Sequence, residues 1–349
     1  MAIPAPPNTN ERGREMAARQ TASASTKTDT TTKRVVRKPV QKTAVPAPSL
    51  TGHVNAYIPD ESKATNYVHR SIRGVEDFTL FDEALENGHS VLIKGPTGSG
   101  KTMVNEAYAA SKGLPFLSVP CDVSIDPNVF FGGFIMDEVT GKLIWNDGPF
   151  TEIFRFGGVI NISEGNMMTP KMAAALFSLL DGRNYIVLQR HRGEIVRRHP
   201  KTLVTMDYNP GYRGTQELNQ AFLNRFEIKV NWDYDTNVED KLLKFQTTKT
   251  VALKLRAMAG VEILTPVSTN MLMEFEKFVL NPKLGLEFAI GNFVAAFAGD
   301  EPAAVEKIME LHNDNFVRDI ASLTGSQTSD DEFEDEFVLD IDGRFEIRS

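Results

Sequence analysis

The chain has 349 residues, of which 41% are hydrophobic and 24% charged, and its formal net charge is −8. This length can hold one large α/β domain and a smaller one, and no apolar run approaches the roughly 18 to 20 residues that a membrane span needs, so we expect no membrane anchor. The start of the chain lacks the apolar core of a secretory signal, which favours a cytoplasmic protein, and the single cysteine excludes an internal disulfide and a multi-cysteine metal site.

The first 50 residues are basic and poor in large apolar side chains. They contain nine Lys or Arg against three Asp or Glu and are rich in Thr, Ser, Pro and Ala. Such a segment cannot bury enough apolar surface to offset the entropy lost on ordering. We therefore predict a disordered basic arm over residues 1–50.

Residues 91–113 carry the strongest motif in the chain. A short apolar run, Val91 to Ile93, predicts a buried parallel strand, and a helical pattern ends near Gly113. Between them lies a GxxxxGK[ST] loop, made of Gly95, Pro96, Thr97, Gly98, Ser99, Gly100, Lys101 and Thr102. Such a loop points backbone N–H groups at phosphate, so we expect ATP here, with Lys101 on the β and γ phosphates and Thr102 on Mg²⁺.

Two features follow the phosphate loop before the next core strand. Cys121 comes directly after an apolar segment, which favours a packed core thiol over a reactive one. Residues 131–148 read FGGFIMDEVTGKLIWNDG, a pattern typical of a β-hairpin that turns at Thr140 and Gly141.

The apolar run from Val159 to Ile162 predicts a second core strand, and Ser163 and Glu164 follow it. In phosphate-loop ATPases an Asp and a Glu commonly stand there, the Asp on metal-bound water and the Glu as the residue that polarises the attacking water. Ser163 can still contact the metal through water, but its hydroxyl brings no negative charge, so metal affinity should fall. Glu164 is the candidate base; the alternative is that it caps the next turn.

A second hairpin is predicted over residues 185–201, with its turn at Arg192 and Gly193. Four arginines cluster there: Arg190, Arg192, Arg197 and Arg198. Such a basic hairpin could bind nucleic acid or an acidic partner, and a solvated tip is the alternative.

The third core strand, Thr202 to Met206, ends in Asp207, Tyr208 and Asn209. The Asn209 amide is our candidate for contacting the γ-phosphate and orienting the water. Because side chains alternate along a strand, Asp207 would share a face with Asn209 and is a candidate metal ligand that restores the acid missing at Ser163. The alternative is a loop residue that bonds its own backbone.

From about residue 235 onward the pattern is helical, with caps or breaks at Asp235, Ser268, Pro282 and Pro302. The tail is acidic: residues 322–349 hold nine Asp or Glu against two Lys or Arg. We predict that the tail is disordered and serves either to bind a partner or to aid solubility.

Several motifs together resemble the MoxR branch of AAA+ ATPases, in particular the CbbQ/NirQ and GvpN-like members. The resemblance covers roughly residues 70–300 and rests on the phosphate loop, on GPFTEIFRFGGVINISEGNMMTPKMAAALFSLLDGR, on GEIVRRHP and on NPGYRGTQELNQAFLNRF. It implies an α/β fold: a parallel sheet of order 5-1-4-3-2 flanked by helices and followed by a small α-helical lid domain. The expected organisation is a basic arm (1–50), a nucleotide-binding domain (51–233), a lid (234–322) and an acidic tail (323–349).

The resemblance also implies roles for individual residues. Lys101 and Thr102 match Walker A, Glu164 matches the Walker B base, and Asn209 matches sensor 1. Arg225 matches an arginine finger that acts in the site of a neighbouring subunit, with a surface ion pair as the alternative. Lys283 stands where the sensor 2 helix usually carries Arg, and it lacks the guanidinium fork.

The function that we expect is ATP hydrolysis by an oligomeric ring, commonly a hexamer, that remodels a separate protein partner. In the family such partners often include von Willebrand A domain proteins. One alternative is a nucleic-acid-associated motor of phage or mobile-element DNA metabolism, which the acidic net charge disfavours. Another is a nucleotide-switched scaffold that hydrolyses ATP slowly because of Ser163.

Overall fold

The computed structural model describes residues 58–121, 128–210, 218 and 220–325, and the backbone of 336–339 and 345–348. Contacts divide the chain into two units, residues 1–48 and 49–349, and every described residue belongs to the second. The predicted basic arm lies outside the described residues.

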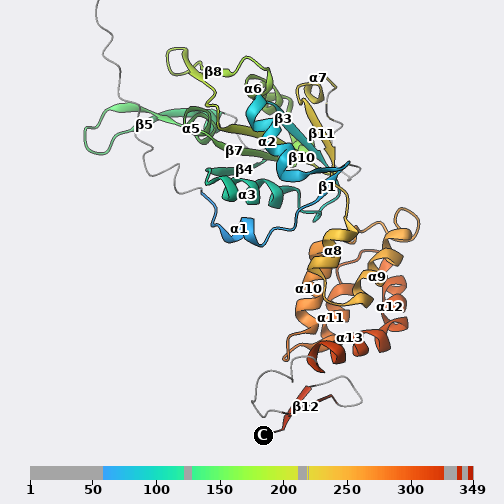
Figure 1. Cartoon of the computed structure of the whole chain (residues 1–349). Helices are drawn as coiled ribbons and strands as arrows, with labels where there is room; N and C mark the ends of the chain where they lie inside the picture. The colour runs from blue at the N-terminus through green and yellow to red at the C-terminus, as the bar shows by residue number, and fades with distance from the viewer. Residues whose placement is uncertain are drawn as a thin grey trace, which may run out of the picture. The chain divides into compact units, whose positions relative to one another are not determined.

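A five-stranded parallel sheet forms the centre of the α/β region (Figure 1). Its strands are β3 (Ser90–Lys94), β4 (Phe116–Pro120), β7 (Gly158–Ser163), β10 (Thr202–Tyr208) and β11 (Ile228–Asn231). Their order in space is β11-β3-β10-β7-β4, and every neighbouring pair is parallel. Counted along the chain within this sheet, the order is 5-1-4-3-2, which confirms the predicted fold.

Helices bury the sheet on both faces. They are α1 (Ser62–Thr65), α2 (Asp77–Asn87), α3 (Lys101–Lys112), α4 (Asn128–Phe131), α5 (Pro149–Phe156), α6 (Pro170–Leu180) and α7 (Gln220–Leu223), with a 3₁₀ turn η2 (Gly165–Met167). Strand β3 supplies Leu92 to one hydrophobic cluster and Val91 and Ile93 to another. Successive strand side chains point to opposite faces, so these two clusters lie on either side of the sheet.

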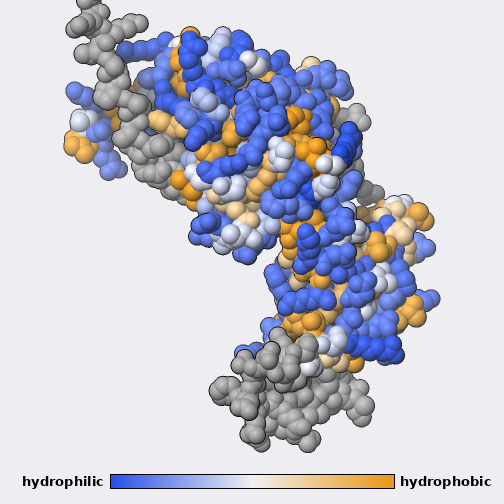
Figure 2. All heavy atoms as spheres, viewed as in Figure 1, coloured by the Kyte–Doolittle hydropathy of each residue, from blue (hydrophilic) through white to orange (hydrophobic). Residues whose placement is uncertain are grey.

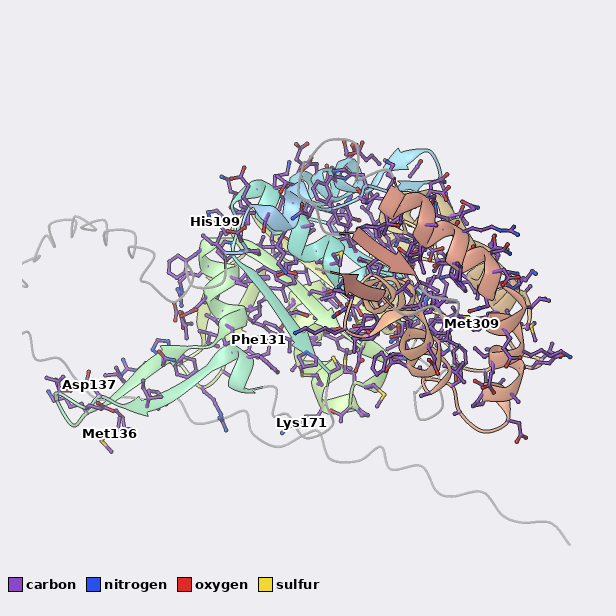
Figure 3. The ribbon with its side chains drawn as sticks, turned by 90° about the horizontal axis from the view of Figure 1, so that it is seen from below. Phe131, Met136, Asp137, Lys171, His199 and Met309 are labelled. Atoms are coloured by element: carbon purple, nitrogen blue, oxygen red, sulfur yellow. The ribbon has the colours of Figure 1, made fainter. Side chains whose placement is uncertain are left out.

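Both predicted hairpins are present. They are β5 (Gly132–Met136) with β6 (Leu143–Asp147), and β8 (Tyr185–Leu188) with β9 (Glu194–Arg197), and a short pair of β1 (Ser71–Ile72) with β2 (Val75–Glu76) precedes α2. In the β8–β9 turn, Arg192 and Gly193 have φ of 56° and 71°, the positive pair that a tight hairpin turn prefers. Figure 3 shows the β5–β6 hairpin extending away from the sheet, with Met136 and Asp137 at its far end and Phe131 at its base.

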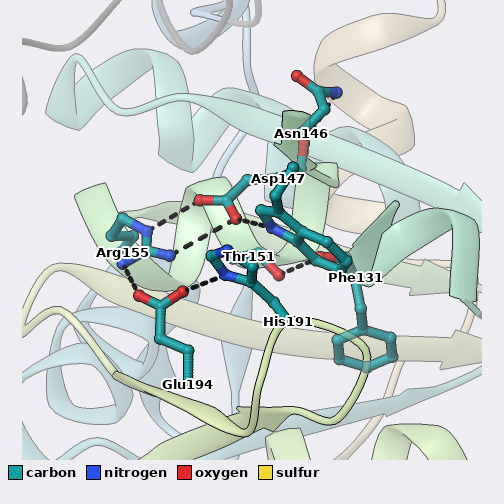
Figure 4. A network of polar contacts seen from close by, with 8 residues as sticks. Phe131, Asn146, Asp147, Thr151, Arg155, His191 and Glu194 are labelled. Atoms are coloured by element: carbon teal, nitrogen blue, oxygen red, sulfur yellow. Dashed lines mark hydrogen bonds and ion pairs between the residues drawn. The ribbon is translucent and has the colours of Figure 1, made fainter. Parts of the chain in front are cut away.

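A polar network joins the two hairpins to α5 (Figure 4). Arg155 donates from Nε to Asp147 Oδ2 at 2.9 Å and from Nη1 to Glu194 Oε1 at 2.8 Å. Trp145 donates from Nε1 to Asp147 Oδ1 at 2.7 Å, and its ring stacks on His191 with centroids 4.7 Å apart. Asp147 and Trp145 belong to β6 whereas Glu194 belongs to β9, so the two hairpins are fastened to each other.

The outer part of the β5–β6 hairpin is apolar. Its exposed large apolar side chains are Phe134, Ile135, Met136, Val139, Leu143 and Ile144, which we call the hairpin patch. Figure 2 shows hydrophobic atoms at the end of this hairpin. Grouped apolar exposure of this kind marks an interaction surface more often than scattered single residues do.

The C-terminal region is helical. It contains α8 (Thr236–Leu242), α9 (Gln246–Ala257), α10 (Thr269–Val279), α11 (Gly285–Val294), α12 (Glu301–Leu311) and α13 (Asn313–Gly325). As predicted, Asp235 and Ser268 cap helices: their side chains accept hydrogen bonds from the N–H groups of Asn237 and Met271. The hydrophobic cluster of this region shares no residue with the two clusters of the sheet.

Part of the acidic tail lies outside the described residues, so its predicted disorder stays a prediction. Helix α13 continues to Gly325, and β12 (Glu336–Leu339) pairs antiparallel with β13 (Phe345–Arg348). Among the described residues, no helix is both long and apolar enough to cross a membrane.

Candidate nucleotide-binding site

The phosphate loop connects the end of β3 to the start of α3. Gly98 and Gly100 have φ of +64° and +91°, conformations that favour glycine. At Gly95 a Cβ would lie 2.0 Å from the carbonyl oxygen of Trp232, so no side chain fits. The glycines of the motif are therefore required by the backbone path and by a close approach to the end of β11.

Lys101 lies at the centre of the loop and is only 6% exposed. Its ammonium donates to the carbonyl oxygen of Pro96 at 2.6 Å and to Asn209 Oδ1 at 2.7 Å. Burial lowers the pKa of Lys101, and the carboxylates of Asp207 and Glu164 oppose that shift. Within the described residues no carboxylate forms an ion pair with Lys101, so a buried cation lacks a direct counter-charge, which a phosphate group would supply.

Asp207 is 2% exposed and lies at the end of β10, beside β7. Its Oδ2 accepts from Asn161 Nδ2 at 2.7 Å, and its Oδ1 accepts from Ser163 Oγ at 3.3 Å. Burial raises the pKa of Asp207, while the Asn161 hydrogen bond and the charge of Lys101 lower it. Asp207 of β10 therefore accepts hydrogen bonds from two side chains of the neighbouring strand β7, those of Asn161 and Ser163.

Two asparagines that the sequence analysis did not select complete this buried network. Asn161 is fully buried, and its Oδ1 accepts from Thr205 Oγ1 at 3.0 Å. Asn105 in α3 donates from Nδ2 to the carbonyl oxygen of Lys101 at 2.8 Å, whereas its buried Oδ1 has no hydrogen-bond partner. The sequence carried a signal for Asn161: it is an amide inside the apolar run from Val159 to Ile162, and a buried amide needs a polar partner.

Glu164 follows β7 with an exposed side chain and a backbone φ of 55°. A left-handed backbone at a residue other than glycine is uncommon and costs free energy. The backbone N–H of Glu164 hydrogen bonds to the Asp207 carboxylate, and Asn166 Nδ2 donates to the carbonyl oxygen of Asn209 at 2.7 Å. The segment after β7 is therefore fixed to the end of β10, and the Glu164 side chain is exposed.

Two predicted site residues lie elsewhere. The Arg225 guanidinium lies 4.4 Å from the centre of the Phe177 ring, and its buried Nε has no hydrogen-bond partner. Lys283 is exposed in the turn before α11, where its N–H donates to Asn281 Oδ1. In the described structure neither residue has a hydrogen bond or an ion pair to the phosphate loop.

The cluster of Lys101, Asp207, Ser163, Glu164 and Asn209 joins a cationic loop to oxygen donors. Hydroxyl and carboxylate oxygens are the ligands that Mg²⁺ prefers, so Ser163, Asp207 and the exposed Thr102 fit that ion. The cationic side fits a phosphate chain, and the two sides together fit a magnesium–nucleoside polyphosphate.

Comparison with known proteins agrees with this geometry. A family model described as AAA domain (dynein-related subfamily) matches residues 90–226, which run from β3 to the residues before β11. An uncharacterized protein of Staphylococcus saprophyticus is 31% identical over 190 residues, covering 52% of this chain and 69% of that protein. Uncharacterized proteins of Staphylococcus epidermidis and Staphylococcus aureus are each 32% identical over 178 residues, covering 49% of this chain and 67% of theirs.

A solved structure from Cytophaga hutchinsonii, described as a "putative ATPase", also matches this chain. The two are 16% identical with a TM-score of 0.37, and the match covers 72% of this chain and 82% of that one. At that TM-score the likeness carries no argument about fold or activity.

Proposed function

We propose that this chain, which belongs to the AAA proteins of the dynein-related subfamily and is an ATP-binding AAA+ ATPase, hydrolyses ATP to remodel a separate protein partner. We further propose that it is of the MoxR type, acts as a cytoplasmic oligomeric ring, commonly a hexamer, and uses Mg²⁺. One observation carries the proposal: among the described residues the buried Lys101 has no carboxylate ion-pair partner, and at the carboxyl ends of the adjacent strands β7 and β10 Ser163 donates to Asp207.

Each residue of the cluster has a defined task in this proposal. Lys101 holds the β and γ phosphates, and the Thr102 and Ser163 hydroxyls with the Asp207 carboxylate would hold Mg²⁺. When bound, this ion neutralises charge that develops on the phosphates. Glu164 accepts a proton from the attacking water, and the Asn209 amide orients that water.

The Asp207–Ser163 contact favours a working ATPase over a scaffold that hydrolyses slowly. Ser163 has no negative charge, but its Oγ lies 3.3 Å from Oδ1 of Asp207. The adjacent strand β10 therefore supplies the carboxylate that β7 lacks. Burial raises the pKa of Asp207, and the hydrogen bond from Asn161 and the charge of Lys101 oppose that shift. Hydrolysis should therefore depend on Asp207.

The surface favours a protein partner, for which a von Willebrand A domain remains our candidate, over nucleic acid. The hairpin patch is apolar, and one arginine of the basic hairpin is used internally: Arg198 donates to the carbonyl oxygens of Gly88 and Thr202 at 2.7 and 2.9 Å. A partly buried arginine whose guanidinium is bonded internally is poorly placed to neutralise a nucleic-acid phosphate. The nucleic-acid motor is therefore the weaker alternative.

The test is phosphate release with ATP and Mg²⁺, beside equilibrium binding of ATP. Glu164→Gln should lower turnover by about a hundredfold or more while ATP still binds. Asp207→Ala should weaken magnesium-dependent ATP binding, and Ser163→Asp in that background should restore it by returning the carboxylate to β7. Asp147→Asn in the hairpin network is the matched control and should change neither quantity.

Two results would contradict the proposal. Absence of ATP binding by the parent protein would remove it altogether. Unchanged magnesium-dependent binding in Asp207→Ala would show that the acid of β10 has no role.

The ring is tested by mixing variants. We propose that Arg225 reaches the site of a neighbouring subunit, so Arg225→Ala should bind ATP but turn it over slowly. Mixed with Glu164→Gln subunits, which keep Arg225, it should recover part of the activity because some interfaces then combine an intact finger with an intact base. Mixtures as inactive as the separate variants would show that Arg225 does not act between subunits.

A further inference from the structure

The phosphate loop is hydrogen bonded to the segment that follows β11. Residues 232–235, which we call the linker, lead from the last strand of the sheet to α8, the first helix of the helical region. Trp232 Nε1 donates to the carbonyl oxygen of Ser99 at 3.1 Å, and Tyr234 Oη donates to the carbonyl oxygen of Thr97 at 2.8 Å. The linker therefore contacts the loop on its carbonyl side.

Arg70 bridges the same two segments from a third place in the chain. It is 8% exposed; its Nη2 donates to Ser99 O at 2.5 Å and its Nη1 to Asp233 O at 2.7 Å. Its guanidinium also lies 4.8 Å from the centre of the Trp232 ring. Two separate carbonyl groups at fixed spacing match the planar fork of arginine, which a lysine cannot reproduce.

The backbone of Arg70 is fixed where α2 begins. Its N–H donates to Asp77 Oδ2 at 2.9 Å, and its carbonyl accepts from the N–H of Asp77 at 3.1 Å. Asp77 is fully buried and also accepts from Tyr67 Oη at 2.7 Å. The Arg70 backbone is therefore held in place. A movement of its guanidinium would follow a movement of its partners, the carbonyl groups of Ser99 and Asp233.

On the other side, the linker is joined to the helices. Arg256 of α9 lies 4.0 Å from the centre of the Tyr234 ring and binds both carboxylate oxygens of Glu239 in α8, at 2.7 and 2.8 Å. Arg70, Trp232 and Tyr234 also line a pocket of about 540 Å³.

Peptide geometry connects these contacts to phosphate. A trans peptide holds its C=O and the next N–H in one plane, pointing in opposite directions from the C–N bond. The carbonyl of Ser99 is therefore fixed to the N–H of Gly100, and that of Thr97 to the N–H of Gly98. In a loop of this motif such N–H groups point at the phosphates. A turn of these peptides toward an anion must move the carbonyls that Arg70, Trp232 and Tyr234 hold.

We propose that Arg70 is a positioning residue that couples nucleotide in the phosphate loop to the linker, by holding Ser99 O and Asp233 O with one guanidinium. The inference rests on the proposed function, because it needs a nucleotide in the loop. Arg70 touches neither phosphate nor water in this scheme; it sets the linker, and with it the start of the helical region, according to the loop's state.

The chain offers a spectroscopic test because it has only two tryptophans, Trp145 and Trp232. In full-length Trp145→Phe, fluorescence comes from Trp232, whose indole N–H is bonded to the loop. ATP with Mg²⁺ should change this emission. Arg70→Lys should keep the nucleotide Kd within about threefold yet lose most of the emission change, and should lower kcat with little change in KM. Arg73→Lys, a nearby exposed arginine, is the matched control and should behave as the parent.

Nucleotide binding is measured separately, by equilibrium dialysis with labelled ATP. Absence of binding would overturn the proposed function and this inference together. Binding without a change in Trp232 emission would overturn the inference alone, as would an Arg70→Lys response equal to that of the parent. If Arg70→Lys does not fold, Tyr234→Phe serves instead: it removes the bond to Thr97 O, keeps the ring beneath Arg256, and should weaken the response by about half or more.

Discussion

Two networks of charged groups can be compared: one at the carboxyl edge of the parallel sheet, and one that joins the β5–β6 and β8–β9 hairpins. They differ in burial and in whether every buried polar group has a hydrogen-bond partner. At the sheet edge Lys101 and Asp207 are almost fully buried, and Asn105 Oδ1 has no partner. In the network that joins the hairpins to α5, the Arg155 side chain is 26% exposed and forms ion pairs with the carboxylates of Asp147 and Glu194. A buried network left incomplete is costly unless a ligand completes it, whereas a half-exposed and complete one needs nothing more.

The strongest test of this contrast uses Cys121, whose N–H donates to the carbonyl oxygen of Ser163 at the sheet edge. Burial raises the pKa of its thiol to about 12 from 9.0, with the carboxylates of Asp207 and Glu164 adding to the shift. At pH 8 the native protein should therefore react with iodoacetamide about a thousandfold more slowly than in urea.

The sign of the pH dependence follows from the raised pKa. The native state holds the thiol proton more tightly than the unfolded chain does, so this contribution to stability is fully present below pH 9.0 and is lost as pH rises toward about 12. Similar alkylation rates in native and unfolded protein would mean that the sheet edge opens easily, and the contrast with the hairpins would fail.

The second test makes the same substitution in both regions. Gly95→Ala places a Cβ 2.0 Å from Trp232 O and should lower the free energy of unfolding by about 3 kcal/mol. Gly141→Ala, in the β5–β6 turn, has nothing within 4 Å of its Cβ and suffers only from its φ of +64°, which costs about 1 kcal/mol. Urea denaturation measures both, and equal losses would show that the loop yields as readily as a hairpin turn.

The smallest effect is expected from the hairpin network itself. Arg155→Met removes the hydrogen bonds to Asp147 and Glu194 and should cost about 1 kcal/mol, because the groups are partly solvated. ATP turnover should not change. Arg190→Met, an exposed arginine of the β8–β9 turn, is the control, and thermal unfolding measures both. A loss in Arg155→Met as large as that in Gly95→Ala would mean that the hairpins are as tightly built as the sheet edge.

Local patterns were sufficient for most of the fold. The phosphate loop, the hairpin turns and the caps at Asp235 and Ser268 depend on residues a few positions apart, so the sequence displays them directly. The sheet order came from the family resemblance. That order sets the ends of β7 and β10 side by side, where Ser163 donates to Asp207, a contact that the sequence analysis did not state.

The contacts that were not expected join residues far apart in the chain. Arg70 bonds to Ser99, 29 positions away, and to Asp233, 163 positions away, and nothing in the sequence near Arg70 indicates either partner. Asn105 and Asn161 belong to different elements and meet only because α3 packs on the sheet. The roles of Arg225 and Lys283 stay predictions, since the former needs a second subunit and the latter lies exposed.

The left-handed backbone of Glu164 bears on how this protein can be improved. A glycine at that position would relieve strain of about 1 kcal/mol, yet it would remove the carboxylate that we assign as the base. Under that assignment, selection for heat resistance alone would favour loss of the proposed base at this one position. Any programme to make the protein more robust should hold residue 164 constant and take its gains from surfaces that the nucleotide never meets.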